Sequence, residues 1–223
     1  MGLSMVAEFS ILTVCTGNIH RSPLAASLLE TWAGWYLPAE LSSHVDVRSA
    51  GLAAPVGSPM GRRVRAMAEA LGADGSNHAA RQIDDELIAS SSLVLVASRR
   101  HRDEVLSRVP SALRVTFTMR EAGRIAAGIV ADHRPLVVRD LVETVAAMAN
   151  RRGDHVDPAT DDVIDPQGLG DDAYLQMAGE EVVPLAHLAA LLLGMPRPDL
   201  DAYIAAAQDP AALTARFTDA ERP

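Results

Sequence analysis

The sequence predicts an α/β fold, a three-layer sandwich in which a mainly parallel four-stranded sheet lies between two layers of helices. Short runs of β-branched and apolar residues alternate along the chain with stretches of helical periodicity, which is typical of β-α-β units. The first run leads into a loop that contains glycine, and a helix with proline in its first turn follows. The length of 223 residues fits one large domain.

The strands and helices of the first half follow one another in order. Strands are expected at residues 10–14, 45–48, 93–97 and 114–118. Helices are expected from Ser22 onward and at residues 60–71, 83–90 and 100–109. The alternation of the two implies parallel strands joined by helical crossovers, with helices on both faces of the sheet.

After Met119 the pattern becomes helical. Two stretches of helical periodicity follow with no strand between them, so we expect a helical insert at about 119–160. A loop rich in Asp, Pro and Gly comes next, then a long helix at 174–194, and a helical C-terminal tail at about 196–223. We expect the insert and the tail to belong to one domain that spans 1–223.

Composition limits the classes of partner. The chain has 29 acidic and 20 basic residues, a net charge of −9, and only two Trp, three Tyr and three Phe. The net negative charge disfavours electrostatic binding to a phosphate backbone, and the few aromatic residues disfavour stacking on bases. No nucleic-acid partner is therefore expected. All basic residues counted as Lys or Arg are Arg, which excludes a phosphate-loop lysine, a kinase lysine and Schiff-base chemistry.

Cysteine usage and hydropathy indicate the compartment. The single cysteine, Cys15, cannot form an internal disulfide, which is typical of a reducing, cytoplasmic setting. The N-terminus has no basic region of a signal peptide, and the longest uncharged apolar stretch, 182–196, contains Pro184 and His187. No membrane span is expected. The seven His residues show no metal-binding spacing, and neither a metal nor another cofactor is predicted.

The strongest signal is a Cys, five intervening residues, and then Arg-Ser between a buried strand and a helix. Five residues between Cys15 and Arg21 can curl so that backbone N–H groups point at one centre, together with those of the helix's first turn. A tetrahedral oxyanion is the natural occupant of such a cradle. The same donors favour Cys15 as a thiolate nucleophile, and the Arg21 guanidinium can hold two oxygens of the anion. The alternative, a buried core cysteine and a surface arginine, does not account for the strand, loop and helix together.

The cradle also gives its other residues roles. The expected substrate-binding residues are Thr16, Gly17, Asn18, Ile19, His20 and Ser22. Ser22 could hydrogen-bond the sulfur, Gly17 is expected to adopt torsions that a side chain forbids, and Asn18 can adopt the left-handed region while bracing the loop. His20 is either a pH-sensitive neighbour of the thiolate or a side chain that faces away from the pocket.

Residues 14–23, Val-Cys-Thr-Gly-Asn-Ile-His-Arg-Ser-Pro, resemble the signature of the low-molecular-weight protein tyrosine phosphatase family, which includes related arsenate reductases. Three later segments resemble the family in the same order. They are Arg48-Ser-Ala-Gly51, His78-Ala-Ala-Arg-Gln82 and Val163-Ile-Asp-Pro166. The resemblance covers about residues 10–118 and 163–194, and it implies a phosphotyrosine phosphatase I-like fold.

The resemblance also implies a division of roles. Cys15 attacks phosphorus to form a phosphocysteine, Arg21 binds the phosphoryl oxygens, and Asp165 protonates the leaving oxygen and then activates water. Asp157 also precedes a proline, and each Asp-Pro pair by itself is typical of a plain turn. Asp165 is preferred because hydrophobic residues at 163–164 can anchor its loop to the core and a helix follows. Neighbouring Asp residues at 161 and 162 are weaker candidates.

Two departures from the family pattern bear on redox chemistry and substrate. Many relatives carry a second cysteine where His20 stands and protect the nucleophile as a reversible disulfide, which this chain cannot form. Oxidation of Cys15 is therefore expected to give a sulfenic acid or a mixed disulfide with a small thiol. Relatives that act on phosphotyrosine commonly have aromatic residues just after Asp-Pro, whereas this chain has Gln167 and Gly168. The helical insert could supply a replacement wall or lid.

The expected function is hydrolysis of phosphate monoesters, with protein phosphotyrosine as the first substrate class. The expected partners are a phosphorylated protein or a small phosphate ester, with inorganic phosphate or arsenate as product or competitor. Two alternatives stay open. One is arsenate reduction completed by an external thiol, since Cys15 is alone. The other is a phosphate- or phosphoprotein-binding module without turnover, for which neither a thiolate nor Asp165 would be needed.

Overall fold

The centre of the fold is a sheet of four parallel strands in the order β2-β1-β3-β4. The computed structural model describes residues 9–130, 134–153 and 160–214. The strands are β1 (Phe9–Cys15), β2 (Val45–Gly51), β3 (Leu93–Val96) and β4 (Thr116–Thr118). All four lie where the sequence predicts strands, so the predicted fold class is confirmed.

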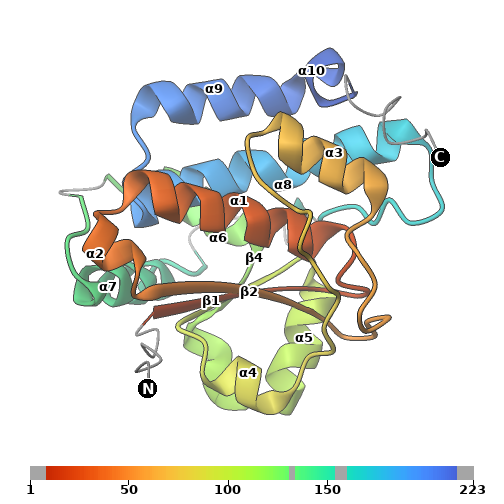
Figure 1. The fold of residues 1–223 in the computed structure, drawn as a ribbon. Helices are drawn as coiled ribbons and strands as arrows, with labels where there is room; N and C mark the ends of the chain where they lie inside the picture. The colour runs from red at the N-terminus through yellow and green to blue at the C-terminus, as the bar shows by residue number, and fades with distance from the viewer. Residues whose placement is uncertain (1–8, 131–133, 154–159, 215–223) are drawn as a thin grey trace, which may run out of the picture.

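Helices cover both faces of this sheet (Figure 1). The described helices are α1 (Arg21–Tyr36), α2 (Ala39–Ser42), α3 (Arg62–Ala70), α4 (Asp85–Ala89), α5 (Arg99–Arg108), α6 (Met119–Ala127), α7 (Val138–Asn150), α8 (Asp171–Leu192), α9 (Arg197–Gln208) and α10 (Pro210–Thr214). A 3-10 turn covers Pro110–Arg114. Helices α4 and α5 lie under one face, and α1, α3, α6 and α8 lie over the other.

The alternation of side chains along the strands divides the interior into two hydrophobic clusters. In β1, Ile11 faces the cluster shared with α1 and α8, whereas Leu12 faces the cluster shared with α4. In β3, Leu95 and Val96 divide in the same way. Both strands are therefore buried on both faces, which explains why they consist of continuous apolar runs.

The helical insert contributes to the larger cluster. Ala122 of α6 and Leu141 of α7 are fully buried in it with residues of β1 and α1. Helix α6 approaches α8 closely at Gly123, where a Cβ atom would lie 2.2 Å from Pro184 Cβ. We infer from this shared core that the insert belongs to the same domain as the sheet. Figure 1 shows α7 at the end of the sheet where β1 begins, away from the loop that follows β1, so α7 forms no lid over that loop.

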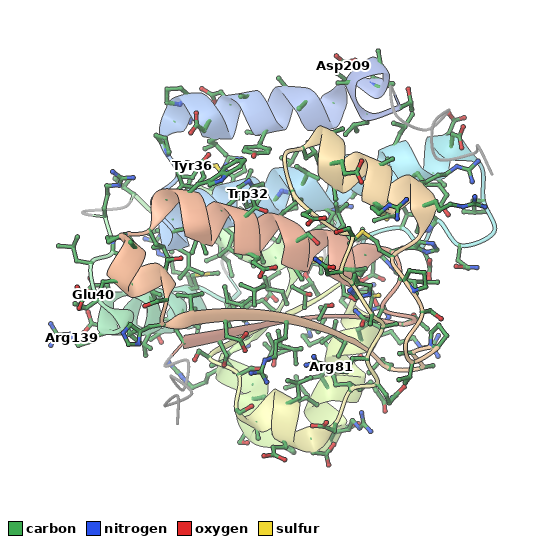
Figure 2. The ribbon with its side chains drawn as sticks, viewed as in Figure 1. Trp32, Tyr36, Glu40, Arg81, Arg139 and Asp209 are labelled. Atoms are coloured by element: carbon green, nitrogen blue, oxygen red, sulfur yellow. The ribbon has the colours of Figure 1, made fainter. Side chains whose placement is uncertain are left out.

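Helix α9, the first helix of the C-terminal tail, packs on the outer side of α1. The rings of Trp32 and Tyr203 meet edge to face with centroids 4.8 Å apart, and Tyr36 donates a hydrogen bond of 2.9 Å to Asp199. Figure 2 shows Trp32 and Tyr36 between α1 and α9. We infer that α9 is a further layer of the same domain.

Because all strands are parallel, the loops that follow their carboxyl ends gather at one edge of the sheet, where α/β folds commonly bind ligands. That edge holds the loop after Cys15, Gly51 at the end of β2, and Ser98 after β3. None of the described helices is long and apolar enough to cross a membrane.

Candidate active site

The loop from Thr16 to His20 joins the end of β1 to the start of α1 and curls around the sulfur of Cys15. The free thiol is buried, with 2% of the residue exposed. Its Sγ lies 3.0 Å from Ser22 Oγ and accepts a hydrogen bond of 3.3 Å from the Asn18 backbone N–H. A backbone N–H and a hydroxyl therefore meet the sulfur, as the spacing of Cys, Arg and Ser predicts.

Asn18 braces the loop from inside, as its place in the sequence predicts. Its backbone has φ of 53°, in the left-handed region that Asn tolerates better than most residues. Its side-chain amide donates to Ser22 Oγ at 2.9 Å and accepts from the Arg81 backbone N–H at 2.8 Å. His78 Nε2 donates to the Asn18 carbonyl oxygen at 2.7 Å. Residues 78–82 therefore hold the loop in place through hydrogen bonds to Asn18. In the sequence, only the resemblance to the family pointed to this segment.

Gly51 permits the loop to lie directly on the end of β2. A Cβ atom at this position would lie 2.6 Å from the Thr16 carbonyl oxygen and 2.9 Å from the Asn18 nitrogen. Both are backbone atoms that cannot move without distorting the cradle. The glycine of the Ser-Ala-Gly segment that ends β2 is thus required for close packing of the loop on the strand.

The expectation for Gly17 is wrong. Gly17 is absent from the glycines with positive φ, and a Cβ atom there would meet nothing closer than Ile19 Cγ1 at 3.5 Å. The turn of the loop falls on Asn18 instead, so the strained torsion is carried by the residue after the glycine.

Arg21 and Asp165 meet across the mouth of the cradle. The Arg21 guanidinium donates to the Asp165 carboxylate through Nη2 and to the Val163 carbonyl oxygen through Nη1 at 3.2 Å. The Arg21 side chain is only 6% exposed, whereas that of Asp165 is 44% exposed. The two residues that the resemblance names for phosphoryl binding and acid catalysis therefore lie side by side.

The loop that carries Asp165 is anchored as expected. Val163 is buried and its N–H donates to the Ala97 carbonyl oxygen at 2.8 Å. The N–H of Ile164 donates to Glu180 of α8 at 2.8 Å. This anchoring holds Asp165 at the carboxyl edge of the sheet.

The other acidic candidates have different surroundings. Asp161 is buried and paired with Arg124 at 2.7 Å, and Asp162 accepts a hydrogen bond of 2.8 Å from the Arg99 backbone N–H. Both carboxylates therefore fix the loop. Asp157, the alternative general acid, lies outside the described residues.

His20 precedes Arg21 and packs against α8. Its ring meets the Tyr174 ring edge to face at 5.6 Å, and a Cβ atom on Gly61 would lie 2.7 Å from its Cδ2. Burial lowers the pKa of His20, the Asp165 charge opposes this effect, and the Arg21 charge adds to it. His20 thus combines a packed ring with electrostatic contact to both charged residues of the site.

Two further groups near the cradle were missed from the sequence. His101, near the start of α5, lies with Nε2 2.9 Å from Thr16 Oγ1 and Nδ1 2.7 Å from Ser98 Oγ. The position of Ser98 just after a parallel strand could have pointed to this neighbourhood, because residues that follow the carboxyl ends of parallel strands lie at the same edge of the sheet. Glu181 of α8 is fully buried, which raises its pKa well above the usual value, and the Arg21 charge opposes this rise. The adjacent Glu180 is only half-buried, and residue type alone does not indicate which of the two glutamates is buried.

Across the described ranges, no three His, Cys, Asp or Glu side chains come close enough together to hold a metal ion. The groups that converge at the cradle are instead a thiol, hydroxyls, backbone N–H groups, a guanidinium and a carboxylate. This set suits a bound oxyanion and nucleophilic attack on it.

Comparisons with known proteins agree with this arrangement. Residues 10–121 match the family model described as low molecular weight phosphotyrosine protein phosphatase. A protein-arginine-phosphatase of Geobacillus stearothermophilus is 35% identical over 124 residues, which are 56% of this chain and 78% of the relative. A low molecular weight protein-tyrosine-phosphatase of Acinetobacter johnsonii is 30% identical over 110 residues, 49% of this chain and 71% of the relative.

Solved structures show the same fold. A tyrosine phosphatase of Erwinia amylovora superposes with a TM-score of 0.59 at 23% identity, covering 84% of this chain and 94% of its own. A low molecular weight protein tyrosine phosphatase of Bacillus subtilis has a TM-score of 0.57 at 25% identity, covering 82% and 97%. From the match over half of its length and the shared sheet, this chain belongs to the low molecular weight phosphotyrosine protein phosphatase family.

Proposed function

We propose that this chain is a cysteine-dependent phosphatase that hydrolyses phosphorylated protein through a phosphocysteine on Cys15. The observation that carries the proposal is that the Asn18 N–H and the Ser22 hydroxyl meet the Cys15 sulfur in the loop that ends at Arg21, which is itself paired with Asp165. Hydrogen bonds to sulfur stabilise a thiolate, which is the nucleophilic form.

In the first step, the Cys15 sulfur attacks phosphorus and the bond from phosphorus to the leaving oxygen breaks. The negative charge spreads over the equatorial phosphoryl oxygens, where Arg21 and the backbone N–H groups of the loop stabilise it. Asp165 gives its proton to the leaving oxygen, so the leaving group departs as an alcohol or phenol. The products are the phosphocysteine and a carboxylate at Asp165.

In the second step, water attacks the phosphocysteine. Asp165 accepts a proton from the water, the bond between sulfur and phosphorus breaks, and inorganic phosphate leaves. The Cys15 thiolate and the Asp165 carboxylic acid are restored. The family match ends at residue 121, so the role of Asp165 rests on its contact with Arg21 and on the resemblance of its segment.

Protein phosphotyrosine is the first substrate class, since the family model and most of the similar relatives carry that name. Protein phosphoarginine is a second candidate. A relative 35% identical is a protein-arginine-phosphatase. In addition, Gln167 and Gly168 follow Asp165-Pro166, where family members that act on phosphotyrosine commonly have aromatic residues. The attack by Cys15 is the same for both, but the bond that breaks in phosphoarginine joins phosphorus to nitrogen.

The test measures hydrolysis of para-nitrophenyl phosphate by wild type and by Cys15→Ser, with a chelator present and Thr144→Val as a control far from the cradle. Turnover in wild type and in the control but not in Cys15→Ser supports the proposal. Equal turnover in Cys15→Ser would reject Cys15 as the nucleophile. Phosphotyrosine and phosphoarginine peptides then assign the substrate class by kcat/KM.

Two further arms address the alternatives. Arsenate with a small thiol tests whether Cys15 takes part in arsenate reduction, which would replace phosphatase chemistry if it alone occurs. Phosphate binding without turnover of any phosphorylated substrate would indicate a binding module.

A further inference from the structure

Three side chains form a line that begins in the core and ends at the cradle. Ser98 Oγ lies 2.7 Å from His101 Nδ1, and His101 Nε2 lies 2.9 Å from Thr16 Oγ1. Ser98 and His101 are buried, whereas Thr16, which directly follows the nucleophile, is exposed. The two hydrogen bonds therefore connect the buried Ser98 and His101 to the exposed Thr16 hydroxyl in the cradle loop.

The hydrogen bonds of Ser98, the buried residue of the three farthest from Thr16, determine which atom donates in each bond. Ser98 is the N-cap of α5, and its Oγ accepts the His101 backbone N–H at 3.3 Å. The Ser98 hydroxyl hydrogen has no acceptor other than His101 Nδ1 within the part of the chain that the structure describes. If it donates to Nδ1, then the ring carries its hydrogen on Nε2 and donates to Thr16 Oγ1.

The opposite direction leaves a buried donor without a partner. If Nδ1 carried the hydrogen, Ser98 Oγ would accept two N–H groups and its own hydrogen would be unsatisfied in the core, which is costly. The ring is also neutral near pH 7, because burial and the Arg21 charge lower the pKa of His101 to about 4. A neutral ring has one donor and one acceptor nitrogen, as this order requires.

We propose that Thr16 contacts the substrate and donates its hydroxyl hydrogen to an oxygen of the phosphorylated group, and that His101 and Ser98 are positioning residues that fix this donor. The inference deepens the proposed function and rests on it. Thr16 Oγ1 accepts from His101, so its own hydrogen is directed elsewhere. His101 is the only partner that the structure gives to this hydroxyl among the described residues.

The experiment compares Thr16→Val, which has the same shape without the hydroxyl, with Thr16→Ser, which keeps it. His101→Phe removes the donor to Thr16, and Ser98→Ala removes the group that sets the tautomer. Thr144→Val is the matched control, because among the described residues the Thr144 hydroxyl donates to the Asp140 carbonyl oxygen of its own helix α7. Each variant is measured for kcat and KM with para-nitrophenyl phosphate, for the inhibition constant of inorganic phosphate, and for Tm.

Loss of a hydrogen bond to a charged acceptor is expected to lower kcat/KM or phosphate affinity by about tenfold or more in Thr16→Val. Thr16→Ser stays within about threefold of wild type. His101→Phe and Ser98→Ala lower the same parameter, but they add no further loss when combined with Thr16→Val. A purely structural role for His101 would instead give losses that multiply in the double variants.

Three results would overturn the inference: wild-type values for Thr16→Val, equal loss in Thr16→Ser, or multiplied losses in the double variants. If His101→Phe does not fold, Ser98→Ala and the two variants of the exposed Thr16 still decide. If wild type binds phosphate without hydrolysing esters, the proposed function fails. The inhibition constant is then replaced by the phosphate dissociation constant, which still tests the Thr16 contact.

Discussion

Arg21 and Asp165, 144 positions apart in the chain, form an ion pair at the mouth of the cradle. The guanidinium that is proposed to hold the phosphoryl oxygens therefore binds the carboxylate that is proposed to deliver the proton. A phosphoryl oxygen that accepts from Arg21 Nη2 competes with Asp165 for this donor. Phosphoryl binding is expected to release Asp165 toward the leaving group.

Replacement of Asp165 separates acid catalysis from binding. Asp165→Asn is expected to lower kcat for para-nitrophenyl phosphate by roughly 10²–10⁴, because the leaving oxygen loses its proton donor. Phosphate affinity should be equal or higher, because Arg21 no longer has a competing carboxylate. Steady-state kinetics and phosphate inhibition measure both effects.

The matched control is Asp201→Asn, which breaks another Arg–Asp pair, that of Arg197 on the surface of α9 at 2.8 Å. It should leave kcat unchanged. A larger loss in Asp157→Asn than in Asp165→Asn would move the acid role to Asp157.

Gly51→Ala tests the close contact between β2 and the cradle. The added methyl group would lie 2.6 Å from the Thr16 carbonyl oxygen, so the loop must shift away from the Cys15 sulfur. We expect kcat/KM to fall by about 10² or more, because misplacement of about 1 Å in a positioned site has costs of this size. Gly34→Ala in α1 is the control, since its methyl group would meet nothing within 4 Å. Similar kinetics for the two variants would contradict the close-packing role of Gly51.

Glu181 makes stability depend on pH. Its pKa is raised by burial above the ordinary value of 4.5, so below that value the folded and unfolded chains both carry the proton. As pH rises above it, the unfolded chain ionises first and the free energy of unfolding falls. Glu181→Gln carries no ionisable group and should remove this fall.

Thermal unfolding of both proteins from pH 5 to pH 8 measures the effect. The Tm advantage of Glu181→Gln should grow with pH by several degrees, since 1 kcal/mol shifts Tm by about 2–4 °C in a domain of this size. A constant difference in Tm over the whole range would show that Glu181 does not contribute this pH dependence.

Gly123→Ala tests whether the insert shares the core of the sheet. The methyl group would lie 2.2 Å from Pro184 Cβ and 2.3 Å from its Cα, so α6 must move away from α8. We expect destabilisation of about 1–3 kcal/mol, the usual cost of overpacking. Gly128→Ala, where the nearest atom is 3.5 Å away, should change stability much less. Equal denaturation midpoints would argue for an insert that is independent of the core.

The sequence predicted the strands, most of the helices and the cradle because these depend on local patterns. The strands β1 and β3 are buried on both faces, and their continuous apolar runs can be recognised as strands from the sequence alone. The spacing between Cys15 and Arg21 likewise places both at one loop. Short elements such as α2 and the 3-10 turn at Pro110–Arg114 carry too few residues to show a period.

Contacts between distant segments could not be predicted in this way. The pairing of Thr16 with His101 depends on how α5 sits after β3, and the burial of Glu181 depends on the packing of α8 against α1. The Gly17 error has a similar origin. A glycine in a tight loop suggests a left-handed torsion, but the bonds that hold Asn18 from outside the loop decide which residue adopts it.

The central claim is that Cys15 carries the phosphoryl group during turnover. The most direct measurement is rapid acid quenching of the enzyme during para-nitrophenyl phosphate hydrolysis, followed by mass spectrometry of the intact chain and its peptides. We expect the mass of one phosphoryl group on the peptide that contains Cys15, and none in Cys15→Ser. Continued turnover with no phosphoryl group on Cys15, or with the group on another residue, would contradict the claim.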